Sequence, residues 1–171
     1  ACVAIAISSP VSLWLQGQPT HPSMIEIKWP APGYDELLEQ PAGVVVEPPL
    51  APAAAGTQQH LLLQMTHEKP LLSGHALWVD RVRPAEWDAF MASSALLRGM
   101  QALERCELSG ELRFGPEEIP LLQAQGVRWF VVNRSAFPFS MKPVVQAYHS
   151  LFRGLFGEPV IRRQGLSIWD A

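Results

Sequence analysis

The sequence predicts an α/β fold, a layered mixed β-sheet flanked by helices and closed by an antiparallel C-terminal hairpin. The near-continuous apolar run 127–133 is typical of a strand that is buried on both faces. Apolar residues recur every three or four positions on either side of this run, which indicates amphipathic helices. Two short strand-like runs surround Gln164 and Gly165, a pair that favours a hairpin turn. Because strand, helix and strand alternate, we expect one layered sheet.

Length, composition and charge narrow the classes of protein to which the chain can belong. The chain has 171 residues, of which 48% are apolar, and a formal net charge of -3. This length suits one domain with or without an appendage, and the apolar content excludes global disorder. The basic residues are scattered, so nucleic acid is not an expected partner. Cys2 and Cys106 do not make a disulfide framework.

The first 23 residues differ from the rest of the chain. Residues 1–7 form an apolar run that fits a buried strand or the trimmed end of a membrane helix. No run in the chain reaches the roughly 20 apolar residues that a bilayer span requires. We therefore expect residues 1–23 to be an N-terminal extension or the end of a membrane-proximal segment, and residues 24–171 to be a single α/β domain.

Prolines punctuate the first half of that domain. Residues 24–28 alternate apolar and polar side chains, which predicts a short strand. Residues 34–40 have helical spacing and stop at Pro41. The β-branched run 43–47 ends at two prolines and predicts a second strand. The apolar run 60–65 predicts another strand.

Helices dominate the middle of the chain. Pro84 suits the first turn of an amphipathic helix that continues to Leu103. Gly99 weakens this helix by about 1 kcal/mol relative to Ala and would allow a break there. A short strand is predicted at 111–114. The acidic pair Glu117 and Glu118 then opens a helix by offsetting the positive end of its dipole.

The last third gives the clearest pattern. Gly126 is a natural left-handed cap for the preceding helix, and the buried strand 127–133 follows it. Ser140 is expected to cap the next helix, which Gly157 ends. The hairpin strands at 160–163 and 166–169 close the chain.

Four segments of the chain have a recognisable order. They are Pro41-Ala42-Gly43-Val44-Val45-Val46-Glu47-Pro48, Gln64-Met65-Thr66-His67-Glu68-Lys69-Pro70-Leu71-Leu72-Ser73-Gly74-His75, Gly126-Val127-Arg128-Trp129-Phe130-Val131-Val132-Asn133-Arg134 and Leu155-Phe156-Gly157-Glu158-Pro159-Val160. Over residues 24–171 this succession resembles the soluble C-terminal tail of bacterial multi-spanning membrane proteins of the glycosyltransferase C-type superfamily, in its mannosyltransferase-like group. Glu68 stands where these tails usually carry Gly, and His75 where an aromatic residue is usual. The insert 80–112 has no clear place in the pattern.

The resemblance implies a location rather than a reaction. Such proteins use lipid-phosphate-linked sugars, and their catalytic acid lies in loops between membrane helices, outside this chain. No catalytic residue and no cofactor therefore carry over. The chain is expected to be an extracytoplasmic accessory domain on the periplasmic side of the cell membrane. Its expected partners are the membrane-embedded part of the parent chain and a glycan or lipid-phosphate-linked sugar.

The loop 67–75 is the predicted ligand-binding face. Its candidate residues are His67, Glu68, Lys69, Ser73 and His75. A purely structural alternative is that His67 and Lys69 make turn hydrogen bonds that fix the loop. Six tryptophans leave a similar choice between core packing and contact with sugar rings or a membrane interface.

Two catalytic hypotheses for the loop fit the residue types but not their spacing. His60, His67 and His75, with Glu68, would supply ligands for a metal-dependent hydrolase. Their spacings of seven and eight match no helical ligand pair, and strand parity would point His60 and His67 to opposite faces. No metal site is therefore expected. Ser73 and His75 are too close in sequence for a nucleophile elbow. An interaction domain without any ligand stays open.

Overall fold

The computed structural model describes residues 2–6, 24–28, 32–50, 63–72, 85–105 and 117–171. The chain divides into two compact units, residues 1–31 and 32–171. In the first unit, β1 (Cys2–Ala6) pairs antiparallel with β2 (Met24–Lys28), which confirms the strand expected at 24–28. The division falls after Ala31, whereas the sequence placed the start of the domain at Met24.

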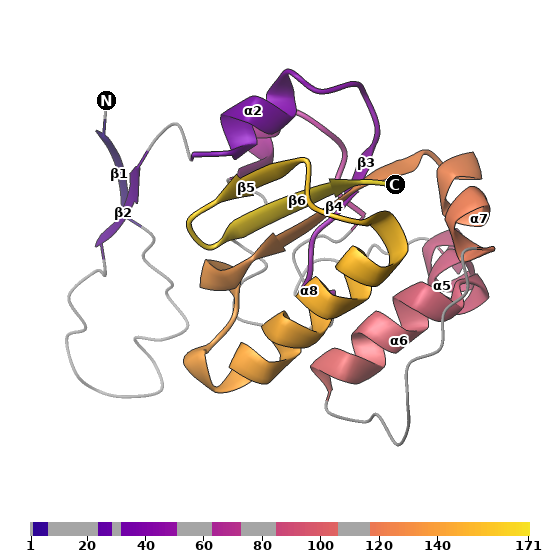
Figure 1. Cartoon of the computed structure of the whole chain (residues 1–171). Coiled ribbons are helices and arrows are strands. Elements are labelled where there is room, and N and C mark those ends of the chain that lie inside the picture. Colours follow the sequence, from indigo (N-terminus) through magenta and orange to yellow (C-terminus); the bar gives the residue numbers. More distant parts are fainter. Residues whose placement is uncertain (1, 7–23, 29–31, 51–62, 73–84, 106–116) are drawn as a thin grey trace. The chain divides into compact units, whose positions relative to one another are not determined.

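The second unit contains a four-stranded mixed sheet with the order β3-β4-β6-β5 (Figure 1). Strand β3 (Val44–Val46) runs parallel to β4 (Val127–Asn133). Strand β6 (Leu166–Asp170) is antiparallel to β4 and pairs with β5 (Ile161–Arg163) in the C-terminal hairpin. The predicted fold class is confirmed, including the hairpin and the buried strand at 127–133.

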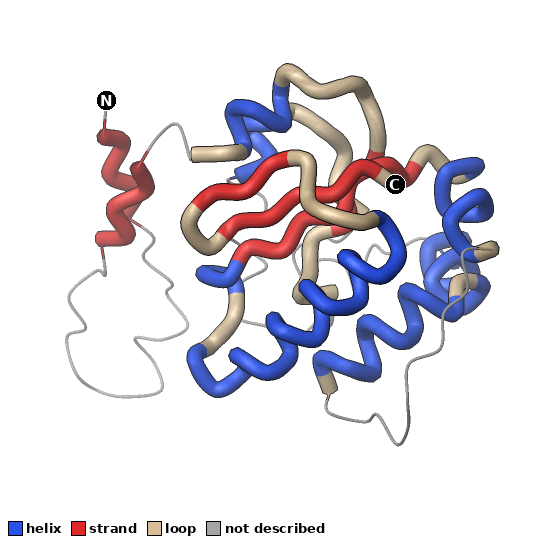
Figure 2. The backbone as a smooth tube through the Cα atoms, viewed as in Figure 1, coloured by secondary structure: helices blue, strands red, loops and turns tan. Residues whose placement is uncertain are grey.

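Helices cover the sheet. They are α2 (Tyr34–Leu38), α5 (Ala85–Ser93), α6 (Ala95–Glu104), α7 (Glu118–Ala124) and α8 (Lys142–Phe156). In Figure 2, the long helices α6 and α8 lie side by side against the sheet, and α2 lies at its opposite side. None of the helices in the described ranges is long and apolar enough to cross a membrane.

Strand β4 is buried on both faces, as alternation along a strand predicts for a sheet with helices on either side. Phe130 and Val132 belong to the main hydrophobic cluster with α5, α6 and α8. Trp129 and Val131 are also fully buried, but lie outside that cluster. The same alternation occurs in β3, where Val46 belongs to this cluster and the equally buried Val45 does not. The sheet is thus the middle layer of the unit.

One predicted element was wrong, and one predicted helix is interrupted at a different residue. The expected strand at 60–65 is, where described, a helical turn at 63–67. A short leucine-rich run carries no β-branched residue and does not separate a strand from a helix. The break in the helix after Pro84 lies at Ser94, not Gly99. Ser94 adopts extended backbone and its Oγ accepts a hydrogen bond from the Leu97 N–H at 3.2 Å, which is the geometry of a helix cap.

The caps of α7 and α8 were only partly predicted. Gly126 (φ 81°) and Gly157 (φ 80°) are left-handed, as expected after these helices. Ser140 is not the cap of α8, because the 3-10 turn Phe139–Met141 precedes the helix and places Met141 at the cap position. The strand expected at 111–114 lies outside the described residues.

Gly43 is required where β3 meets β4. A Cβ at this position would lie 2.5 Å from Cβ of Arg128, closer than packed carbon atoms allow. We predict that Gly43→Ala separates the two strands and lowers the free energy of unfolding by about 1–3 kcal/mol, measured by urea denaturation. A Cβ placed on Gly154, in α8, would have no atom within 4 Å. The control Gly154→Ala should raise stability by about 0.5–1 kcal/mol. Equal stabilities for the two variants would contradict the close approach.

Candidate functional site

The loop that carries the predicted ligand residues is fixed against β3. The Glu68 N–H donates to the Gln64 carbonyl at 2.7 Å, and Gln64 Nε2 donates to the Lys69 carbonyl at 3.0 Å. The chain then runs parallel to β3. The Val45 N–H donates to the Pro70 carbonyl and the Leu72 N–H to the Val45 carbonyl, both at 2.8 Å. Residues 70–72 thus cover the outer edge of β3.

His67 lies inside the unit, with no exposed surface. Its ring stacks on Tyr34 with 5.8 Å between ring centroids, and its Nδ1 accepts a hydrogen bond from the Lys69 N–H at 3.1 Å. Burial, together with the positive charge of Lys69, lowers the pKa of His67 to about 4. The imidazole is therefore neutral at physiological pH. Because Nδ1 accepts, the proton is on Nε2, which has no hydrogen-bond partner in the described part of the chain.

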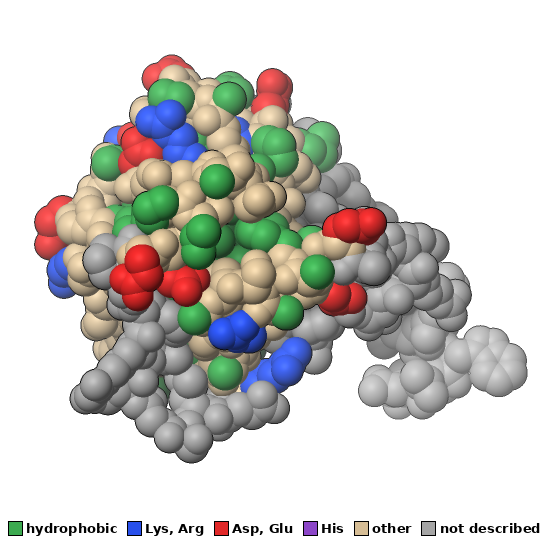
Figure 3. All heavy atoms as spheres, turned by 90° about the vertical axis from the view of Figure 1, so that its right-hand side faces the viewer, with side chains coloured by type: hydrophobic (Ala, Val, Ile, Leu, Met, Phe, Trp, Pro, Cys, Tyr) green, Lys and Arg blue, Asp and Glu red, His purple; other side chains and the backbone are tan. Residues whose placement is uncertain are grey.

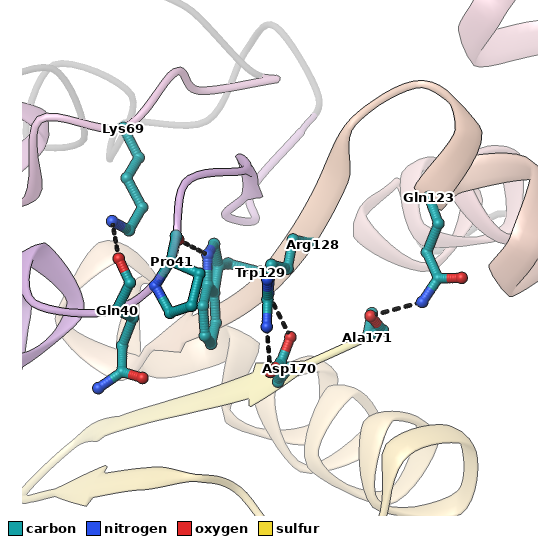
Figure 4. Close-up of polar contacts among 8 residues, drawn as sticks. All are labelled: Gln40, Pro41, Lys69, Gln123, Arg128, Trp129, Asp170 and Ala171. Atoms are coloured by element: carbon teal, nitrogen blue, oxygen red, sulfur yellow. Dashed lines mark hydrogen bonds and ion pairs between the residues drawn. The ribbon is translucent and has the colours of Figure 1, made fainter.

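Lys69 closes the end of helix α2 (Figure 4). Its Nζ donates to the carbonyls of Gln40 at 2.8 Å and Leu38 at 3.4 Å. A cation at the C-terminal end of a helix satisfies carbonyls that lack partners within it. Burial and the nearby charge of Arg128 lower the pKa of Lys69. The turn hydrogen bonds expected for His67 and Lys69 are confirmed.

Glu68 is the exposed member of this group. It has φ 55°, the left-handed region in which a side chain is unfavourable and Gly is preferred. Of the predicted ligand residues, the structure thus brings His67, Glu68 and Lys69 together in one turn. Ser73 and His75 lie outside the described residues, as does His60, and ligand binding stays a prediction.

A buried polar cluster behind this loop was not predicted. The Tyr34 hydroxyl donates to Glu47 Oε1 and accepts a hydrogen bond from Asn133 Nδ2 at 3.1 Å. Asn133 Oδ1 in turn accepts from the N–H of Ser135 at 3.0 Å and from its Oγ at 2.7 Å. Glu47 and Asn133 lie at the carboxyl ends of the parallel strands β3 and β4, where open α/β sheets usually bind ligands. Here Tyr34 joins them and closes that edge.

Burial sets the protonation of this cluster. Glu47 has no exposed surface, and burial raises the pKa of its carboxyl to about 8, although the Tyr34 hydrogen bond acts against this rise. Burial and the Glu47 carboxyl raise the pKa of Tyr34 well above its ordinary value. Glu47 is therefore mostly neutral at pH 7. The visible clue in the sequence was an acid placed directly after a β-branched run and before two prolines.

A separate open hollow of about 500 Å³ lies near the C-terminal end of β6. It is lined by Ala42, Gln123, Gly126, Val127, Arg128, Asp170 and Ala171. Arg128 forms a two-point pair with Asp170, Nε to Oδ1 at 2.8 Å and Nη2 to Oδ2 at 3.0 Å, and Gln123 Nε2 donates to the Ala171 carbonyl at 2.7 Å (Figure 4). These polar groups of the hollow bond to one another.

Figure 3, which shows the side of α5 and α7, has hydrophobic side chains in the middle of the face and charged ones around them.

Three segments that lie far apart in the sequence meet around β3. Trp129 Nε1 donates to the Pro41 carbonyl at 3.1 Å, and Gly43 packs against the Arg128 side chain. Lys69 reaches the carbonyl of Gln40, next to Pro41 (Figure 4). We call this set of contacts, between residues 40–46, 64–72 and 126–129, the β3 junction. Among the described residues, no group of three or more His, Cys, Asp or Glu side chains could hold a metal ion.

The backbone of Glu68 gives a test of the junction. We predict that Glu68→Gly raises the free energy of unfolding by up to about 1 kcal/mol, because Gly removes the cost of the left-handed conformation. Glu68→Ala, which removes the carboxylate but keeps a Cβ, should stay within about 0.5 kcal/mol of the wild type. Chemical denaturation of the three proteins measures both differences. A destabilised Gly variant would argue against a strained turn.

The pKa values of Glu47 and His67 predict opposite contributions to stability. Glu47 loses its proton near pH 4.5 when unfolded but keeps it to about pH 8 when folded, so its contribution is lost as the pH rises through that window. Wild type should therefore lose stability relative to Glu47→Gln by about 1.4 kcal/mol per pH unit between pH 4.5 and 8. Denaturation curves across this range measure the difference.

His67 supplies the matched control. The unfolded imidazole binds a proton below pH 6.5, whereas the buried one stays neutral to about pH 4, so its contribution is lost as the pH falls through that window. Relative to His67→Gln, wild type should lose stability on acidification from pH 6.5 to 4. Profiles of wild type and either variant that run parallel would contradict the burial argument.

Comparison with known proteins adds no relative. No protein-family model matches the chain, and neither the curated proteins nor the solved structures give a match.

Proposed function

We propose that this chain is an extracytoplasmic accessory domain of a bacterial multi-spanning membrane protein similar to the glycosyltransferase C-type superfamily. It supports the membrane-embedded part of the parent chain from the periplasmic side and carries no catalysis of its own. The observation behind the proposal is the β3 junction. Sequence segments that resemble such tails lie far apart in the chain and meet there through direct hydrogen bonds and close packing.

The contacts of the β3 junction support a fold in common with such membrane-protein tails. They do not indicate a reaction in common. Gly43 makes room for Arg128, Lys69 caps α2, and Pro70 covers the edge of Val45. The roles of Gly43 and Lys69 depend on their side chains, or on the lack of one, whereas Pro70 contributes only its backbone carbonyl. The left-handed backbone of Glu68, at a position where the tails usually carry Gly, agrees with the same interpretation.

Ligand contact is proposed at the solvent side of the loop. Glu68 is exposed there, and Ser73 and His75 follow it in sequence. A glycan or lipid-phosphate-linked sugar is the expected ligand. The second candidate is an interaction domain with no ligand. It is favoured because His67 Nδ1 and Lys69 Nζ both form hydrogen bonds within the chain. Titration of lipid-phosphate sugars, followed by tryptophan fluorescence, separates the two, since only the first candidate predicts saturable change.

The proposal predicts the parent gene and the side of the membrane. We expect several apolar spans of about 20 residues in the same reading frame as this segment. In the full-length protein, a protease site placed at the exposed Glu158 should be cut in intact spheroplasts, from the periplasmic side. A matched site in a cytoplasmic loop of the parent should be cut only after lysis. A reading frame without such spans, or cleavage at Glu158 only after lysis, would exclude the proposal.

A further inference from the structure

The connection between β4 and α8 presents an aromatic side chain to solvent. It consists of the 3-10 turn Arg134–Ala136, Phe137, Pro138 and the 3-10 turn Phe139–Met141. Phe139 is 84% exposed, the highest value among the large hydrophobic residues described. Phe137, two positions earlier, is buried and packs against Tyr148 with 6.0 Å between ring centroids. One aromatic residue therefore anchors the connection while the other projects from it.

The connection is fixed by backbone hydrogen bonds. The Arg134 N–H donates to the Gly165 carbonyl at 2.7 Å, which ties it to the turn of the β5–β6 hairpin at the same end of the sheet (Figure 1). The Phe137 N–H donates to the Arg134 carbonyl at 3.2 Å, and the Met141 N–H to the Pro138 carbonyl at 2.9 Å. Phe139 thus projects from an ordered turn rather than from a loose loop.

Positive charge surrounds this aromatic side chain. Arg134 and Lys142 are both exposed and line a shallow hollow of about 150 Å³ together with Phe139. Residues 119–157 contain no Asp or Glu. Arg128 and Arg153 in the same stretch are paired with Asp170 and Glu158. Arg134 and Lys142 have no ion-pair partner within the described ranges, so their charge is directed to solvent.

We infer that this connection is a contact site for an anionic lipid bilayer. Phe139 would enter the headgroup region, where aromatic side chains are favoured, and Arg134 and Lys142 would contact lipid phosphates. The inference deepens the proposed function, on which it rests, by naming the surface that meets the membrane. The hollow is smaller than ordinary ligand pockets of about 300–1,000 Å³. A protruding ring needs a matching cavity on a protein partner, whereas a bilayer surface accepts it anywhere.

Bilayer contact through so few side chains is weak in a free domain but becomes effective when the domain is tethered to the membrane. Each cation near an anionic surface strengthens binding by about fivefold. Two cations and one aromatic ring therefore give modest affinity to the free chain. A short connection to a membrane-embedded parent would raise the effective concentration of the surface and make the same contacts orient the domain.

Vesicle sedimentation with the 171-residue chain tests the inference. Wild type should pellet with vesicles containing phosphatidylglycerol, less with pure phosphatidylcholine vesicles, and less at high salt. Phe139→Ser and Arg134→Ala/Lys142→Ala should each weaken binding, by about fivefold for each side chain removed. Leu121→Ser on α7 (61% exposed in the wild type) and Arg98→Ala on α6 are matched controls and should bind as wild type.

Several results would overturn the inference. They are equal binding to neutral and anionic vesicles, no binding at millimolar lipid, and unchanged binding by the triple variant of Phe139, Arg134 and Lys142. A polyglutamate peptide that binds in place of vesicles, with the same dependence on these residues, would make the site a peptide site instead. Urea denaturation shows whether each variant keeps the wild-type fold. Failure here leaves the proposed function intact, because the reading frame and protease tests decide that separately.

Discussion

The backbone of Val45 holds this unit together at its first strand. Its N–H and carbonyl bond to Pro70 and Leu72, while β3 pairs with β4 on the other edge. Strand β3 has only three residues, too few to be stable as an isolated edge. Pairing on both sides removes the exposed edge and joins segments that are distant in sequence. Without the cover from residues 70–72, the parallel pair would expose the unpaired groups of Val45.

This constraint explains why the loop after His67 looks like a functional site. Buried His and Lys residues suggest chemistry, yet here they maintain the geometry of a turn. The Lys69 ammonium closes α2, and the Lys69 N–H donates to His67 Nδ1. The proton-transfer capacity of a histidine near pH 7 is lost because burial keeps the ring neutral. Within this turn, the Glu68 side chain is the charged group that is still exposed to solvent.

Much of the fold could be predicted because its main signals are local. The apolar run of β4 indicates burial on both faces, and the left-handed glycines mark the helix ends at Gly126 and Gly157. The failures came where local signals are ambiguous. The leucine-rich run before Gln64 fits either period. The interruption lies at Ser94, whose side chain caps the start of α6, and the helix continues through Gly99. At Ser94 a specific contact, not the periodicity, decided where the second helix begins.

The candidate site was predictable only in part, for the same reason. The turn bonds of His67 and Lys69 span two or a few residues and follow from the residue types. The cluster of Tyr34, Glu47 and Asn133 does not, because Tyr34 and Asn133 are 99 positions apart. Only the pairing of β3 with β4 brings their strand ends together. A buried acid is favourable there because it can stay neutral and share a hydrogen bond.

Asn133 connects this interior to the surface. Its Nδ2 donates to the Tyr34 hydroxyl inside, and its Oδ1 accepts two hydrogen bonds from Ser135 in the first turn of the β4–α8 connection. One side chain therefore seals the carboxyl edge of the sheet and fixes the start of the connection that presents Phe139. An edge that would bind a substrate in many α/β proteins is filled here by the protein's own polar groups. The same groups instead give the outer turn a fixed geometry, which a contact surface requires and a flexible loop would not provide.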